Sequence, residues 1–352
     1  MHTPLVELTD NGLYCPAGGF YVDPWRAVDR AVITHAHGDH ARADCAHYLA
    51  AAPGRGVLQL RVGAGADIQS VAYGERVKHG DVEVSLHPAG HILGSAQVRI
   101  ERGGEVWVVS GDYKLGPDPT CAAFEPVRCD TFISESTFGL PIYRWPPQSR
   151  VFADINQWWR GNQQAGKASL LVCYALGKAQ RVLAGVDAGI GPVYLHGAVE
   201  RVTAAYRAAG VEMVPTQTVD LSRRGGDWSR ALIVAPPSAL NSPWARRFRP
   251  FASGFASGWM RIRGARRRRA VDRGFVLSDH ADWPGLLAAI AATGASRVLV
   301  THGRAATLVR YLAEERGLDA QVLATRFVGE GEEAAVEEPD AGDGAGAEEV
   351  RS

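Results

Sequence analysis

Short apolar segments separated by turn residues occupy the first 140 residues of the chain. Segments of this kind, a few residues long and bounded by residues such as Gly, Pro, Asn or Asp, are typical of β-strands. We therefore expect a β-rich region with few long helices. Its predicted strands are residues 31–34, 57–60, 82–86, 97–100 and 106–109.

The pattern changes near residue 150, where amphipathic segments begin to alternate with apolar runs. Helices are expected within residues 152–164, 178–189 and 198–210. Strands are expected in the apolar runs at residues 169–175, 192–197 and 231–237. Helix and strand in turn predict a small parallel α/β unit.

Two further apolar strands, each leading to a histidine, follow a basic stretch near residues 261–273. They are FVLSDH (275–280) and RVLVTHG (297–303), and helices are expected around residues 283–293 and 304–317. The simplest architecture is a β-rich domain that is interrupted by an α/β insertion and completed by the C-terminal part of the chain.

Length and composition agree with a globular protein of this organisation. The chain has 352 residues, of which 46% are hydrophobic and 22% charged, so two domains or one domain with a large insertion are expected. No apolar run reaches the roughly 18 residues of a membrane span, and the N-terminus lacks the features of a secretory signal. The five cysteines are scattered, which suits reduced thiols. A cytoplasmic protein is therefore expected, with no membrane partner.

Charge is distributed unevenly, although the formal net charge is zero. Residues 330–352 carry nine acids against one base, Arg351, so the rest of the chain is at +8. This segment is rich in Gly, Ala and Glu and has no aromatic residue, which predicts an acidic disordered tail. The tail either keeps the protein soluble or, through its charge, repels or mimics nucleic acid.

The densest group of metal-ligand residue types is Thr34-His35-Ala36-His37-Gly38-Asp39-His40, directly after a predicted strand. Three histidines and one aspartate within six residues would be poor core material, because each needs a polar partner when buried. A sharp loop after a strand can instead direct them toward one metal ion. His91 and Asp112 also follow strands, and each taken alone is equally compatible with a turn or cap residue.

Taken in order, these motifs resemble those of a known family. HAHGDH, GHILGSA and SGDYK are similar to the ordered motifs of metallo-β-lactamase-fold hydrolases, while the segments around Glu135, His280 and His302 resemble the additional motifs of the β-CASP nucleases. Within that group, ESTFGLPIYRWP, MRIRGARRRR and GFVLSDHADW look most like the bacterial ligase-associated DNA exonucleases.

The resemblance implies an α/β fold, namely a metallo-β-lactamase αββα sandwich with an inserted β-CASP α/β domain. The N-terminal part of the sandwich would be residues 1–145 and the insertion residues 146–262. The C-terminal part of the sandwich would be residues 263–329, followed by the acidic tail at 330–352.

The resemblance also implies roles for individual residues. One metal would be held by His35, His37 and His91, the other by Asp39, His40 and His302, and Asp112 would bridge the two. Asp23 would orient a ligand histidine, although an Asp-Pro turn explains it equally well. His280 would bind the scissile phosphate or protonate the leaving oxygen with support from Glu135, and its alternative is a cap of the following helix.

A basic surface favours nucleic acid as the substrate, since phosphates attract clustered arginines. The residues proposed to contact it are Lys178 and Arg181, at the start of an expected helix, and Arg261, Arg263, Arg266 and Arg267. The alternative for Lys178 and Arg181 is an ordinary basic helix start. The alternative for the four arginines is a solvated basic face.

The implied activity is a metal-dependent phosphodiesterase, with attack of a metal-bridging hydroxide on phosphorus. Its cofactors would be two divalent metal ions, zinc first and manganese second, because imidazole dominates the ligand set. We expect a DNA exonuclease that processes ends in repair, with a DNA ligase or helicase of the same pathway as a partner.

The alternatives are an RNA-processing nuclease, a small-molecule hydrolase, and an inactive binding protein of the same fold. A histidine at the position of His302 is commoner among the RNA enzymes of this superfamily, which favours the first of these three.

Overall fold

Two β-sheets packed face to face form the larger part of the protein in a computed structural model, which describes residues 4–219, 226–262, 264 and 271–326. The first sheet has the order β1 (Glu7–Thr9), β2 (Gly12–Cys15), β3 (Phe20–Val22), β4 (Arg30–Val32), β5 (His47–Ala51) and β6 (Ile68–Val71). The second has the order β19 (Asp319–Val322), β18 (Arg297–Val300), β11 (Thr131–Ser134), β10 (Glu105–Val109), β9 (Ala96–Arg102), β8 (Val82–Pro88) and β7 (Arg76–His79).

Alternation of apolar side chains explains why the two sheets pack together. Val84, Leu86 and Val98 point into the space between the sheets and are fully or almost fully buried there. The opposite faces are covered by helices: α1 (Arg55–Val62) lies on the first sheet, and α7 (Trp283–Thr293) and α8 (Ala305–Arg316) lie on the second. This arrangement confirms the expected αββα sandwich.

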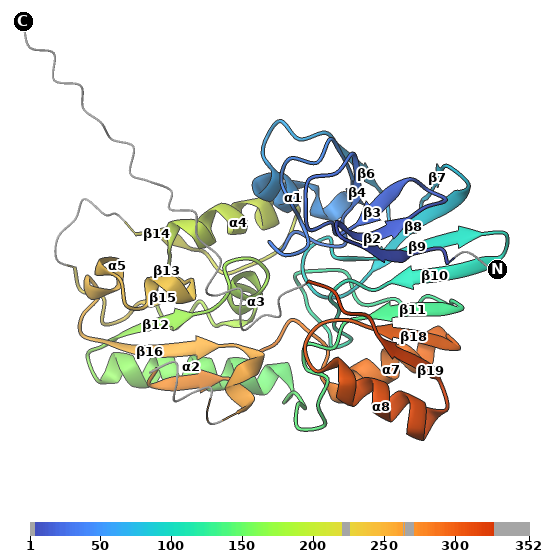
Figure 1. Cartoon of the computed structure of the whole chain (residues 1–352). Helices are drawn as coiled ribbons and strands as arrows, with labels where there is room; N and C mark the ends of the chain where they lie inside the picture. The colour runs from blue at the N-terminus through green and yellow to red at the C-terminus, as the bar shows by residue number, and fades with distance from the viewer. Residues whose placement is uncertain (1–3, 220–225, 263, 265–270, 327–352) are drawn as a thin grey trace, which may run out of the picture.

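The segment expected to be inserted forms a third sheet, at the left of Figure 1. Its order is β14 (Gln217–Thr218), β13 (Val193–Leu195), β15 (Leu232–Ala235), β12 (Ala168–Val172), β16 (Phe251–Ala256) and β17 (Arg273–Phe275), and all neighbouring strands run parallel. Its helices are α2 (Gln148–Gln164), α3 (Lys178–Gly185), α4 (Gly197–Ala208) and α5 (Pro243–Arg246). The third sheet ends with Phe275, beyond the expected domain boundary at residue 262.

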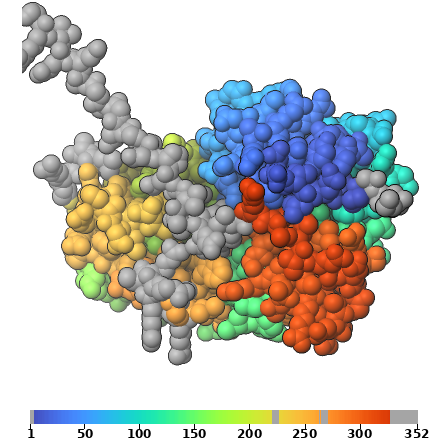
Figure 2. Space-filling model, viewed as in Figure 1, coloured from blue at the N-terminus to red at the C-terminus, as the bar shows by residue number. Residues whose placement is uncertain are grey.

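The chain returns to the sandwich after β17, so that segments far apart in sequence become neighbours. β18 pairs in parallel with β11, and the Arg326 guanidinium lies 5.6 Å from the ring of Trp25. Figure 2 shows the same return, because the red C-terminal segment packs on the blue N-terminal part. Within the described residues, no helix combines the length and apolar character needed to cross a membrane.

One expected strand is a helix in the structure. Residues 57–60 lie within α1, which begins after Gly54 and ends before Gly63. Val57 and Leu58 are buried against the first sheet, whereas Leu60 is 53% exposed, so only one side of the segment meets the core. A four-residue apolar run fits a buried helix turn as well as a strand, which is why the prediction was wrong.

Trp159 of α2 provides a test of the packing in the inserted domain. Its side chain is fully buried, and its Nε1 donates a hydrogen bond to the Arg230 carbonyl at 3.0 Å. We expect Trp159→Ala to lower the free energy of unfolding by about 3–5 kcal/mol, as measured by denaturant titration. Leu60→Ala is the control, with an expected change within about 0.5 kcal/mol. A loss below about 1 kcal/mol for Trp159→Ala would contradict this packing.

Candidate metal centre

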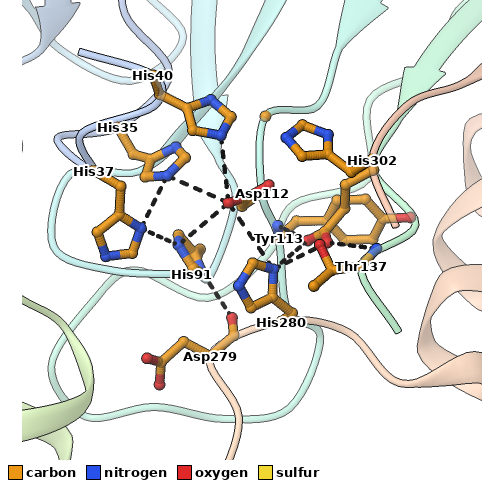
Figure 3. Close-up of polar contacts among 12 residues, drawn as sticks. His35, His37, His40, His91, Asp112, Tyr113, Thr137, Asp279, His280 and His302 are labelled. Carbon is orange, nitrogen blue, oxygen red and sulfur yellow. Dashed lines mark hydrogen bonds and ion pairs between the residues drawn. The ribbon is translucent and has the colours of Figure 1, made fainter. Parts of the chain in front are cut away.

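The predicted ligands come together at one edge of the sandwich, in loops that follow the strands. His35, His37 and His40 follow β4, His91 follows β8, and Asp112 follows β10. Figure 3 shows these side chains, together with His280 and His302, pointing toward a common centre. Residues separated by more than 250 positions therefore form one site.

His35, His37 and His91 form the first group. His37 Nδ1 lies 3.1 Å from His35 Nε2 and 3.1 Å from His91 Nε2. In a tetrahedral zinc site, two nitrogens that are each about 2.0–2.1 Å from the ion lie about 3.3 Å apart. The spacing of these nitrogens therefore matches that of ligands around one ion.

The outer nitrogens of these imidazoles face oxygen atoms. His35 Nδ1 lies 3.0 Å from Thr34 Oγ1, His37 Nε2 3.2 Å from the Leu176 carbonyl oxygen, and His91 Nδ1 2.8 Å from the Asp279 carbonyl oxygen. A carbonyl oxygen can only accept, so His37 and His91 carry their protons on these outer nitrogens. Their inner nitrogens then present lone pairs to the centre, as metal ligation requires.

Asp112 lies between the two predicted groups of ligands. Its Oδ2 is 3.4 Å from His35 Nε2, 3.8 Å from His91 Nε2 and 3.5 Å from His40 Nε2. The residue is only 5% exposed, so its charge acts in a region of low dielectric constant. This position suits a carboxylate shared by two cations.

Asp39, His40 and His302 form the second group, and each offers a ligand atom within 4.8 Å of the others. His40 Nε2 is 3.4 Å from Asp39 Oδ2, and the rings of His40 and His302 are stacked with centroids 5.4 Å apart. Among the described residues, the buried Asp39 Oδ1 has no hydrogen-bond partner. A buried carboxylate oxygen of this kind is costly unless a cation or proton donor compensates it.

Asp23 contacts the second group at the outer ring nitrogen of His40. Its Oδ2 is 2.7 Å from His40 Nδ1 and accepts a hydrogen bond from Thr34 Oγ1 at 2.5 Å, while its Oδ1 accepts from the Thr34 backbone N–H at 2.8 Å. Its backbone has φ 45, an uncommon conformation for a non-glycine residue that here directs the carboxylate inward. The chain bends at Asp23, and the contacts of its carboxylate are those that the predicted orienting role requires.

We expect Asp23→Asn to weaken metal binding by about 10–100-fold, the usual cost of removing a carboxylate that orients a ligand imidazole. The neutral amide has one acceptor oxygen in place of two charged ones, so it cannot accept the hydrogen bonds of both His40 and Thr34 as the carboxylate does. Titration of the metal-free protein with zinc, against Asp10→Asn as a control, measures the effect. An unchanged zinc affinity would exclude an orienting role for Asp23.

Burial keeps three of the histidines neutral. It lowers the pKa of His35, His91 and His302 well below the usual range, and neighbouring histidines lower each pKa further. Neutral imidazole is the form that binds a metal. The electrostatics of these positions therefore agree with a ligand role.

His40 behaves in the opposite way. Burial opposes its charged form, but the surrounding carboxylates outweigh this effect and raise the pKa of His40 well above the usual range. They belong to Asp39, Asp112 and Asp23. This half of the site is therefore strongly negative and favours a positive charge at His40 or beside it.

His280 and Glu135 form a buried pair next to these groups. His280 Nδ1 lies 3.0 and 3.1 Å from the two Glu135 carboxylate oxygens, and Glu135 also accepts from the Tyr113 backbone N–H at 2.8 Å. Burial acts to raise the pKa of Glu135, but His280 outweighs it and the pKa is lowered. The ionised Glu135 fixes the His280 ring with its Nδ1 toward the carboxylate.

The donor set fits two divalent cations. Asp112 belongs to the first group of converging ligand atoms, and its Oδ2 lies 3.5 Å from His40 Nε2 of the second group. The buried Asp39 Oδ1 lacks a hydrogen-bond partner among the described residues. Imidazole and carboxylate in this ratio suit zinc, and manganese is compatible with the carboxylates. His35, His37, His91 and Asp112 would hold one ion, and Asp39, His40, His302 and Asp112 the other.

The predicted nucleic-acid contacts are placed differently. Lys178 is fully buried and Arg181 is 6% exposed, and both form ion pairs with Asp279. Their contact with a phosphate stays a prediction, and a phosphate would have to compete with the Asp279 carboxylate for both cations. Arg261 is exposed, and its Nε donates to the Ile142 carbonyl at 3.4 Å. The remaining three arginines lie outside the described residues: Arg263, Arg266 and Arg267.

Comparison with known proteins yields one structure of similar fold and several sequence relatives. No protein-family model matches the chain. A crystal structure of a protein of unknown function from Enterococcus faecalis has a TM-score of 0.54, with 10% identity and coverage of 85% of this chain and 80% of that one. A likeness at this identity supports the fold alone.

Three relatives share sequence similarity with the chain and therefore say more than the likeness of fold. The chain is 32% identical over 315 residues to a protein of Opitutus terrae named probable DNA ligase. This match covers 89% of this chain and 30% of that protein. It is 33% identical over 124 residues to cleavage and polyadenylation specificity factor subunit 3 of Dictyostelium discoideum, covering 34% of this chain and 16% of that protein. It is 27% identical over 211 residues to the RNase J-like protein of Methanocaldococcus jannaschii, covering 51% and 50%.

The chain thus spans half or less of the length of these relatives. The αββα sandwich and its ligand loops define a metallo-β-lactamase-fold protein. Within that class, the chain is related to β-CASP nucleases, and the resemblance found in its sequence motifs is confirmed.

Several groups that shape the site carry no motif of their own. The carbonyl groups of Leu176 and Asp279 hold His37 and His91, and the Thr301 hydroxyl lies 2.7 Å from His302 Nδ1. Any residue can supply a carbonyl, so the sequence gives no signal for the first two. Thr34 and Thr301 directly precede ligand histidines, and this adjacency was the only available hint.

Proposed function

We propose that this chain is a metal-dependent nuclease, and specifically a DNA exonuclease that processes ends in DNA repair. One observation carries the proposal: seven side chains converge as two ligand groups that share the Asp112 carboxylate. Two-cation sites of this kind suit phosphodiester hydrolysis, since two divalent ions about 3.5–4 Å apart supply an activated water and stabilise charge on the phosphoryl group.

The protein's own residues would then position the phosphate and manage protons. His280 lies at the edge of the centre, with Nδ1 4.0 Å from Asp112 Oδ2. Because Nδ1 faces the Glu135 carboxylate, a proton given to the leaving oxygen would come from Nε2. Glu135 holds the ring in this orientation and stabilises its protonated form.

DNA is the proposed substrate because of the relative whose similarity extends over most of the chain. That relative carries a ligase name, which supports action alongside a DNA ligase. A helicase of the same pathway and a cytoplasmic location stay expectations from the sequence. We propose zinc as the native ion, with manganese as the alternative, from the ligand set.

RNA is the second candidate. His302 occupies the position where RNA enzymes of the family commonly have histidine, and two relatives are named as a cleavage and polyadenylation factor subunit and as RNase J-like. These matches cover 34% and 51% of the chain, against 89% for the ligase-named relative. For this reason we favour DNA.

The deciding experiment uses matched DNA and RNA oligonucleotides, single-stranded and duplex, each labelled at either end. The protein is loaded separately with zinc and with manganese, and metal-free protein is the control. Stepwise loss of nucleotides from DNA with RNA spared is the expected result and gives the direction of digestion. Preferential cleavage of RNA would overturn the substrate, and no cleavage of either would overturn the nuclease proposal.

A further inference from the structure

The first turn of α3, in the inserted domain, lies directly on the first ligand group. The Leu176 carbonyl just before it is 3.2 Å from His37 Nε2. Gly177 has φ 88, and a Cβ added there would lie 2.3 Å from the side chain of Ile92, next to His91. Only a glycine permits this close approach.

Two buried cations of α3 hold the residue that orients His91. Lys178 Nζ lies 3.1 Å from Asp279 Oδ2, and Arg181 Nη1 lies 3.1 Å from Asp279 Oδ1. The Asp279 carbonyl oxygen is in turn 2.8 Å from His91 Nδ1. Asp279 also directly precedes His280, so the same short segment positions a predicted ligand and a predicted proton donor.

Arg181 connects this segment to two further parts of the protein. Its guanidinium lies 3.2 Å from Asp118 Oδ2, in the loop after β10, and donates to Gln148 Oε1 of α2 at 2.8 Å. It also donates to the Ser278 carbonyl. Removing one member of such a buried network leaves the other charges without compensation, which makes each pair costly to break.

The second ligand group is oriented from the sandwich itself. Asp23 holds His40, and Thr301 contacts His302. Both residues belong to loops that follow strands of the two packed sheets. His37 and His91 of the first group are thus held by Leu176 of the inserted domain and by Asp279, whereas His35 and the second group are supported from the sandwich.

We propose that the inserted domain sets the geometry of one metal site, through Leu176 and the ion pairs of Lys178 and Arg181 with Asp279, while the other site is set by the sandwich. Lys178, Arg181 and Asp279 are then positioning residues for His91 and His280, and the two sites differ in their dependence on domain contacts. This inference rests on the metal-binding part of the proposed function.

The test is Asp279→Asn in the full chain. The substitution keeps the side-chain size and the main-chain carbonyl that faces His91, but removes the charge shared by both ion pairs. We expect the affinity for one of two bound zinc ions to fall by about 10–100-fold, so that dialysis against a competing chelator leaves about one ion per chain. The visible spectrum of the cobalt(II)-substituted protein should change as well, because it reports ligand geometry.

The matched control is Asp187→Asn, because Asp187 forms an exposed ion pair with Arg160 at 2.7 Å in the inserted domain. It should leave zinc stoichiometry and the cobalt spectrum unchanged. The double variant Asp279→Asn/Lys178→Met removes charges of both signs and should weaken zinc binding no more than Asp279→Asn alone, because the two residues act as one unit.

A lower melting temperature of Asp279→Asn with unchanged zinc affinity and an unchanged cobalt spectrum would overturn the inference, since the network would then be only structural. Equal weakening of both zinc ions would overturn the division between domains. A wild-type protein that fails to bind two ions would instead overturn the metal-binding proposal on which the inference rests.

Discussion

Replacement of Asp112 by asparagine is expected to abolish metal binding and nuclease turnover together. Asp112 Oδ2 lies 3.4 Å from His35 Nε2 and 3.5 Å from His40 Nε2, so both ligand groups depend on one anionic oxygen. The amide keeps the shape but supplies no negative charge. We expect turnover to fall at least about 10³-fold, equivalent to about 4 kcal/mol of lost transition-state stabilisation.

Metal analysis after dialysis and a single-turnover cleavage assay measure the two effects on the same preparation. Asp67→Asn is the matched control, because Asp67 is an exposed aspartate, directly before β6, that pairs with His47 at 2.7 Å. It should retain both metal and activity. Retention of two metals and full activity by Asp112→Asn would show that the two groups do not share this carboxylate.

The sequence indicates the predicted ligands to different degrees. His35, His37 and His40 occur within six residues, and local density alone indicated a metal site. His91 and Asp112 are isolated in sequence, and their ligand role followed only from the ordered motifs of a known family. The structure brings all of them to one edge of the sandwich because each follows a strand whose end lies there.

The elements of the fold were predictable where hydrophobic periodicity extends over a long segment. α4 (Gly197–Ala208) and α7 (Trp283–Thr293) lie close to their expected ranges. The run at residues 57–60 is too short to distinguish the two periodicities, and its helix depends on packing against the first sheet. Tertiary contacts, which the local sequence does not contain, decide such cases.

The basic residues illustrate a different limit. Lys178 and Arg181 follow a glycine at a helix start, a position that favours anions. The structure shows that the anion is internal, since Asp279 lies 101 and 98 residues further along the chain yet pairs with both. Sequence alone cannot show that a cation is already neutralised by a carboxylate from a distant segment.

The second large effect is expected for His280→Ala, which should retain both metals but lose most of the turnover. His280 is 4% exposed and pairs with Glu135, whereas the seven predicted ligands do not include it. Loss of a positioned proton donor typically lowers the rate by about 10²–10⁴-fold. Metal content and single-turnover rates of the variant separate this role from ligation.

His47→Ala is the matched control, since the His47 side chain is 55% exposed and also pairs with a carboxylate. Glu135→Gln provides an independent check, because it leaves His280 in place and removes only the charge that supports its protonated ring. If His280 donates the proton, Glu135→Gln should lower turnover and displace the alkaline limb of the pH–rate profile to lower pH, since the imidazolium loses its stabilising anion and gives up its proton at a lower pH. Loss of metal from His280→Ala would instead make His280 a ligand, and an unchanged pH profile for Glu135→Gln would mean that the pair only supports the loop.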